Sequence, residues 1–112
     1  MPERDERLYL DDILRAIDRI LSYTAEGRDA FFADSRTQDA VIRNIEVIGE
    51  AIRGVLPATR AGHPEVPWKQ IAGTRDRVIH GYFTVDLEIV WEIAEKELAE
   101  LRRLVAAMIE QA

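Results

Sequence analysis

Three stretches of the chain carry apolar residues three or four positions apart, the spacing that places side chains on one face of an α-helix. The longest stripe lies near the C-terminus and consists of Leu87, Val90, Trp91, Ala94, Leu98, Leu101, Val105 and Met108. Earlier stripes consist of Leu10, Ile13, Leu14, Ile17, Ile20 and Leu21, and of Val41, Ile45, Ile48 and Ile52. No alternating two-residue pattern extends far enough to indicate a β-strand. The sequence therefore predicts an all-α protein.

The ends of these helices are marked by short polar residues. Ser35 is the predicted N-cap of the second helix, since its hydroxyl can accept a hydrogen bond from an unpaired backbone N–H. Thr84 or Asp86 would begin the C-terminal helix. Between the first two helices, residues 27–35 leave room for a short turn of helix at most.

Residues 55–83 connect the second stripe to the last. Pro57, Gly62 and Pro64 indicate a loop in the first half of this segment. Pro67 can open a further helix, because its missing N–H would be unpaired there in any case, and Gly81 would end that helix. We therefore expect an up-and-down bundle of four main helices with an additional short helix, forming a single domain over residues 1–112.

Charge and cysteine content narrow the function classes. The net charge of −6 disfavours sequence-independent binding to long nucleic acids, yet residues 51–80 carry five cations and two acids. This local excess suits a selective anionic substrate, although charge also fluctuates along any chain. The absence of cysteine rules out disulfides and thiolate metal sites. The charged N-terminus and the lack of a long apolar stretch predict a cytoplasmic protein with no membrane partner.

Residues 75–83, RDRVIHGYF, bring an arginine, a histidine and a tyrosine together. Arg75 and His80 are five positions apart, so on a straight helix they would diverge by about 140°. They can converge on one substrate only if the helix ends before Gly81, or if two copies of the chain build the site.

These residue types suit metal-independent RNA cleavage, with no cofactor. Histidine is a natural proton carrier near neutral pH, and arginine holds a phosphate through a bidentate fork. Simpler interpretations exist for each residue. His80 could interact with a helix C-terminus, Arg75 could lie over apolar surface, Asp76 and Arg77 could form a solvated pair, and Tyr82 could be a core or interface aromatic.

Longer segments around this motif resemble a known family. The segments WKQIAGTRDRVIHGY and TRDRVIHGYFTVDLEIVWEIAEKEL resemble the C-terminal half of HepT-like proteins, the toxin branch of the HEPN superfamily. DAVIRNIEVIGEAIR resembles the preceding helix of that family, so the similarity runs from about residue 8 to about residue 105. The resemblance implies a HEPN-like helical bundle that forms a homodimer, with the motifs of two protomers facing each other.

The resemblance also implies a function. Family members are typically endoribonuclease toxins paired with a minimal nucleotidyltransferase (MNT) antitoxin, which in part of the family adds AMP to the tyrosine of the motif. By position, Arg75 would stabilise the phosphate, His80 would carry protons and Tyr82 would accept AMP. Asp76 would complete the catalytic set, at a position where the family commonly has Asn. An acid there would repel the phosphate unless it is paired, with Arg77 or with His80 of either subunit.

Two hypotheses from other classes remain open at this stage. The chain could be a non-catalytic module that docks with a nucleotidyltransferase and presents or senses a nucleotide, whereas the toxin could join its antitoxin in a larger hetero-oligomer. It could also be a structural helical dimer without chemistry, in which case the motif residues would tolerate substitution as exposed positions do.

Overall fold

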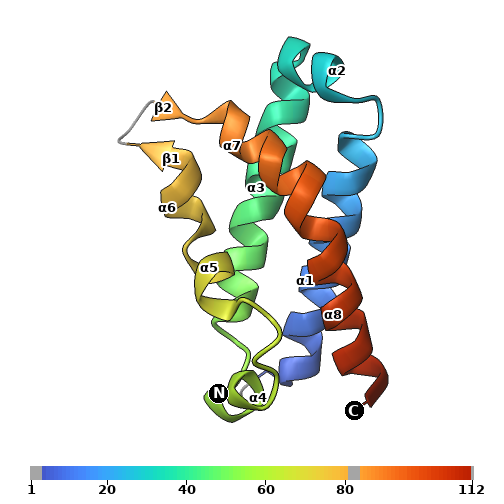
Figure 1. Ribbon diagram of the computed structural model, residues 1–112, viewed down its shortest axis with the longest axis vertical. Helices are drawn as coiled ribbons and strands as arrows, with labels where there is room; N and C mark the ends of the chain where they lie inside the picture. The colour runs from blue at the N-terminus through green and yellow to red at the C-terminus, as the bar shows by residue number, and fades with distance from the viewer. Residues whose placement is uncertain (1–3, 81–83, 112) are drawn as a thin grey trace.

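The computed structural model describes residues 4–80 and 84–111, and these residues form a helical bundle (Figure 1). The long helices are α1 (Glu6–Tyr23), α3 (Ser35–Ile52) and α8 (Leu98–Gln111). Helix α7 (Leu87–Glu92) runs into α8 through a π-helical turn, η1 (Ile93–Glu97). The prediction of an all-α protein is confirmed.

The predicted apolar stripes meet in one core. Side chains from α1, α3, α7 and α8 are almost fully buried there, including Ile13, Ile17, Ile20, Val41, Val90 and Val105. The expected short helix is α2 (Arg28–Ala33), which closes one end of the bundle (Figure 1). Its Phe31 is buried, and the ring centroid lies 5.5 Å from that of Trp91. Burial of Phe31 therefore explains why so short a helix forms.

The helix starts agree with the sequence in one case and differ in the other. Asp86 is the N-cap of α7, and its carboxylate accepts a hydrogen bond from the backbone N–H of Ile89 at 3.2 Å. The prediction for Ser35 is wrong, because the N-cap of α3 is Asp34, whose carboxylate accepts from the Arg36 N–H at 3.0 Å. An aspartate one position earlier provides the same hydrogen bond with a charged acceptor, which also suits the positive end of the helix dipole.

The connector is more structured than predicted. Helix α4 (Pro57–Gly62) occupies the expected loop, and the single helix expected from Pro67 to Gly81 is divided. Helix α5 (Trp68–Ala72) ends at Gly73, and α6 (Thr74–Val78) follows directly. The chain then becomes extended in β1 (Ile79–His80), which pairs antiparallel with β2 (Thr84–Val85). The predicted helix end at Gly81 lies outside the described residues.

Local sequence gives a physical reason for this early helix end. Val78 and Ile79 are β-branched, and a helix restricts the χ1 rotamers of such side chains, which lowers their helix propensity. The carbonyl of Val78 accepts a hydrogen bond of 2.7 Å from the backbone N–H of Asp86, so it is satisfied without a further helical turn. Within residues 4–80 and 84–111, no helix is both long and apolar enough to cross a membrane.

Candidate functional site

The motif lies on the arm formed by α5, α6 and the small hairpin, beside α3 (Figure 1). Arg75 and Asp76 are on α6 and His80 is on β1, and all three side chains are exposed. Within the described part of the chain, they make no side-chain hydrogen bond or ion pair. The fourth predicted site residue, Tyr82, lies outside the described residues.

The early end of α6 means that the divergence expected on a straight helix does not apply to Arg75 and His80. A continuous helix would separate the directions of Arg75 and His80, but the backbone turns from helical to extended at Ile79. This is the first of the two arrangements that the sequence allowed. The structure thus places an arginine and a histidine on successive short elements, with both side chains open to solvent.

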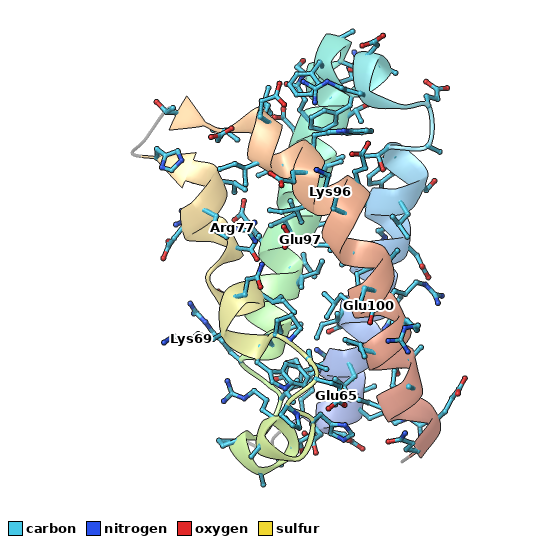
Figure 2. All side chains as sticks on the ribbon, in the orientation of Figure 1. Glu65, Lys69, Arg77, Lys96, Glu97 and Glu100 are labelled. Carbon is cyan, nitrogen blue, oxygen red and sulfur yellow. The ribbon has the colours of Figure 1, made fainter. Side chains whose placement is uncertain are left out.

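Arg77 does not pair with its neighbour Asp76. It reaches Glu97 at the end of η1, with Nη1 to Oε1 at 3.0 Å and Nη2 to Oε2 at 2.9 Å (Figure 2). The hydrogen bonds that Arg77 donates to Glu97 raise the pKa of Arg77 above its usual value, and partial burial opposes the shift. The structure therefore leaves Asp76 without the neighbouring cation that the sequence offered it.

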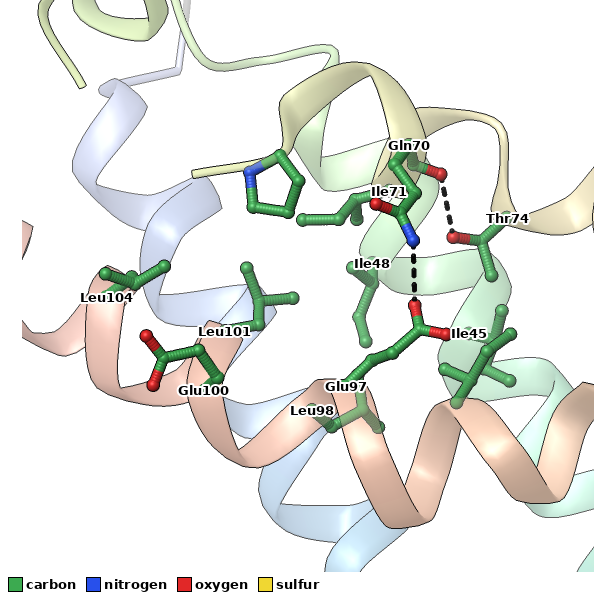
Figure 3. Close-up of a pocket in the computed structure, with 12 residues that line it drawn as sticks. Ile45, Ile48, Gln70, Ile71, Thr74, Glu97, Leu98, Glu100, Leu101 and Leu104 are labelled. Carbon is green, nitrogen blue, oxygen red and sulfur yellow. Dashed lines mark hydrogen bonds between the residues drawn. The ribbon is translucent and has the colours of Figure 1, made fainter. Parts of the chain in front are cut away.

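Hydrogen bonds satisfy the polar groups at the break between α5 and α6. The Thr74 hydroxyl is buried and donates to the carbonyl of Gln70 at 3.2 Å, and the Gly73 N–H donates to the Lys69 carbonyl at 3.1 Å. The side-chain amide of Gln70 donates to Oε1 of Glu97 at 3.3 Å (Figure 3). These hydrogen bonds join α5 to α6 and α5 to η1, next to the motif in the sequence.

An apolar pocket of about 160 Å³ lies between α3, α5 and the η1–α8 helix (Figure 3). Ile45, Ile48, Ile71, Leu98 and Leu101 line it, with Glu97 at its edge. None of the exposed motif residues contributes to it. The pocket and the motif are therefore separate features of the structure.

The structure also shows how some of the cations in residues 51–80 are paired. Of the cations in residues 51–80, Arg53 pairs with Glu50 and Arg77 pairs with Glu97, and both acids lie outside that segment. Arg75 forms no ion pair within the described residues, so its charge is available to an anion. Among those same residues, no three histidine or acidic side chains are grouped as metal ligands would be.

A family comparison gives this motif its context. The model of the family described as "Ribonuclease HepT-like" matches residues 13–108. The chain belongs to this HepT-like family. The match includes the whole arm that carries Arg75, Asp76 and His80.

Curated relatives of this HepT-like chain agree with the assignment. A protein of Thermococcus cleftensis named "Probable ribonuclease HepT" is 39% identical over 101 residues, covering 89% of this chain and 92% of that protein. A protein of Methanocaldococcus jannaschii named as a "Putative RNase" is 40% identical over 104 residues, covering 92% and 90%. A second protein of that organism, named "Gamma-glutamylcyclotransferase and putative RNase", is 39% identical over 109 residues. There the match covers 96% of this chain but only 49% of the relative. No solved structure matches this chain.

Sequence reasoning missed one pair in this HepT-like fold, Arg77 with Glu97. The two residues are twenty positions apart and lie on different elements. The motif points to Arg75 and His80, and the sequence alone predicts a solvated surface pair of Asp76 with Arg77. The only indication in the sequence was the basic excess of residues 51–80 opposite the acidic C-terminal helix.

Proposed function

We propose that this chain is a metal-independent endoribonuclease toxin that cleaves RNA as a homodimer, with Arg75, Asp76 and His80 of two protomers around one phosphodiester. The observation that carries the proposal is the exposed arginine and histidine on α6 and β1 in a chain of the HepT-like ribonuclease family. The ribonuclease names of relatives about 40% identical support the same activity.

The proposed chemistry divides proton transfer between two imidazoles. His80 of one protomer takes the proton of the 2′-hydroxyl, and the 2′-oxygen attacks the phosphorus to form a 2′,3′-cyclic phosphate. His80 of the other protomer gives a proton to the departing 5′-oxygen. Arg75 stabilises the negative charge that accumulates on the phosphorane. A histidine suits both roles because its ordinary pKa lies near neutrality.

Asp76 has a supporting role in this proposal. Its carboxylate is exposed beside Arg75 and has no side-chain partner among residues 4–80 and 84–111, so in the dimer it can accept a hydrogen bond from an imidazole. Such a bond would orient His80 in the assembled dimer. It would also reduce the repulsion between the carboxylate and the substrate phosphate.

Regulation in this proposal follows the family pattern. A cytoplasmic MNT-type nucleotidyltransferase binds the toxin, in a hetero-oligomer, and adds AMP to Tyr82. The tyrosine lies two residues after His80 in the sequence, so a nucleotide there would add bulk and negative charge next to the site. Mass spectrometry of the co-expressed proteins tests this step: the added AMP should disappear in Tyr82→Phe.

RNA digestion by the purified protein with EDTA present tests the catalytic proposal. Arg75→Ala and His80→Ala should abolish cleavage while folding stability changes by no more than about 0.5 kcal/mol, because both side chains are exposed. Arg43→Ala is the matched control, since Arg43 is exposed on α3 and forms no ion pair within the described residues. Cleavage at the parent rate by both motif variants would refute the mechanism. A parent that binds a nucleotidyltransferase but cleaves no RNA would favour the docking module instead.

A further inference from the structure

One ion pair fixes the side of α6 opposite Arg75. Arg77 follows Arg75 by two positions, which turns it by about 200° around a helix, and it lies toward η1. Its guanidinium donates to both carboxylate oxygens of Glu97, at 3.0 and 2.9 Å. A bidentate pair constrains orientation as well as distance. The contact therefore restrains rotation of α6 about its own axis.

The surroundings of this pair differ from those of the other ion pairs. Both side chains are 32% exposed, and Gln70 adds a third hydrogen bond to Glu97. The pair of Arg102 with Asp18 also joins two distant elements, but its side chains are 44% and 51% exposed. Because a half-buried pair is less screened by water and salt, the Arg77 pair holds its geometry more firmly than a surface pair does.

The pair lies between the two residues that matter for catalysis. Helix α6 has five residues, too few to be stable without tertiary contacts. Arg77 is two positions after Arg75 and three before His80. On the other side of Val78, the hairpin pairs His80 with Thr84. The motif is therefore held at its middle by the ion pair and at its end by the hairpin.

The π-helical turn places Glu97 for this contact. Glu97 is the last residue of η1, and π-helical turns are rare and often occur at functional sites. A regular α-helix through this segment, one residue shorter, would rotate Glu97 by about 100° relative to α7. Its carboxylate would then no longer face Arg77. The irregular turn thus carries the carboxylate that Arg77 contacts, and Figure 2 shows the two side chains pointing toward each other.

We infer that Arg77 and Glu97, aligned by η1, are positioning residues that hold Arg75 and His80 in the orientation needed for RNA cleavage without touching the RNA themselves. This inference rests on the proposed ribonuclease function. It predicts that loss of the pair lowers turnover much more than substrate binding, and that the loss is repaired when the two charges are exchanged.

The test compares the parent with Arg77→Met and with the double variant Arg77→Glu plus Glu97→Arg. Arg102→Met is the matched control, because it removes a two-point ion pair between distant elements away from the motif. Initial rates on a short RNA are measured below the lowest melting temperature. Arg77→Met should lower kcat by about 10- to 100-fold with KM within about twofold of the parent, since misplacing catalytic groups acts on turnover. The double variant Arg77→Glu plus Glu97→Arg should recover most of the parent kcat, and Arg102→Met should have the parent kcat.

Several results would overturn the inference. An Arg77→Met protein with the parent kcat shows that the pair does not position the motif, and a rise in KM alone shows that Arg77 binds RNA directly. A parent that cleaves no RNA refutes the proposed function instead. In that event, the rate of amide hydrogen exchange at residues 74–80 tests whether the pair has a positioning role. Faster exchange in Arg77→Met but not in Arg102→Met supports a positioning role, and unchanged exchange in both refutes it.

Discussion

Asp86 offers a quantitative test of how the hairpin is joined to the C-terminal helix. Its carboxylate accepts one hydrogen bond from the Ile89 N–H at 3.2 Å, and this is the side-chain cap of α7. Replacing an N-cap aspartate with alanine costs about 1 kcal/mol. With an unfolding entropy of about 2.1 cal mol⁻¹ K⁻¹ per residue, a chain of 112 residues has roughly 0.24 kcal mol⁻¹ K⁻¹ in total. Asp86→Ala should therefore lower the melting temperature by about 4 °C.

The matched control for this prediction is Asp86→Asn, which keeps the acceptor oxygen and should remain within about 0.3 kcal/mol of the parent. Thermal unfolding followed by circular dichroism, with urea unfolding as a second method, measures both variants. The backbone N–H of Asp86 still donates to Val78 in each, so the hairpin contact is unchanged. Equal stability of Asp86→Ala and the parent would refute the capping argument. An equal loss in both variants would show that the negative charge, and not the hydrogen bond, stabilises α7.

Two further predictions concern the bundle away from the motif. Gly54→Ala should destabilise the fold by about 1–3 kcal/mol in urea unfolding, because the added Cβ would lie 2.3 Å from the ring of Tyr9. A stability equal to that of the parent would show that Tyr9 can move aside. The hydrogen bond from Arg102 lowers the pKa of Asp18, so this ion pair stabilises the fold above the ordinary aspartate pKa of about 3.9 and is lost as the pH falls through the lowered value. Arg102→Met should therefore lower the midpoint of urea unfolding slightly at pH 7 and by less near pH 3. A decrease in the midpoint that becomes larger on acidification would contradict this.

The long helices could be predicted because each buries one apolar stripe. The residues that recur at helical spacing, such as Ile13, Ile17, Val41 and Val105, are the ones that the structure buries almost completely. Packing of these stripes determines α1, α3 and α8 whatever the loops do. Asp86 was predictable for a similar reason, since capping depends on residues only a few positions apart.

The connector could not be predicted from apolar periodicity, since its short elements depend on individual hydrogen bonds between side chains and the backbone. The indole N–H of Trp68 donates to the carbonyl of His63 at 3.0 Å, which fixes the turn before α5. Thr74 is buried and satisfies the Gln70 carbonyl at the break between α5 and α6. An apolar periodicity through residues 68–79 agrees with one helix or with two, and only these hydrogen bonds distinguish them.

The candidate site was predictable in part. Arg75 and His80 stood out as residue types suited to phosphodiester chemistry, and the structure places both at the surface. The partner of Arg77 could not be predicted, because Glu97 is twenty positions away on another element, at the end of a π-helical turn. Nothing in the sequence of residues 93–97 indicates such a turn. The role of Tyr82 in AMP addition stays a prediction.

The central claim is that one active site needs the imidazoles of two protomers, and mixed dimers test it most directly. Parent protein is unfolded together with inactive His80→Ala protein at fixed total concentration, and the mixtures are refolded and assayed on RNA. If both imidazoles serve one site, mixed dimers are inactive and the activity of an equal mixture falls to about one quarter of that of the parent. If each protomer acts alone, the activity falls only to about one half. A quarter is the result that this account predicts, and a linear decline to one half would contradict it.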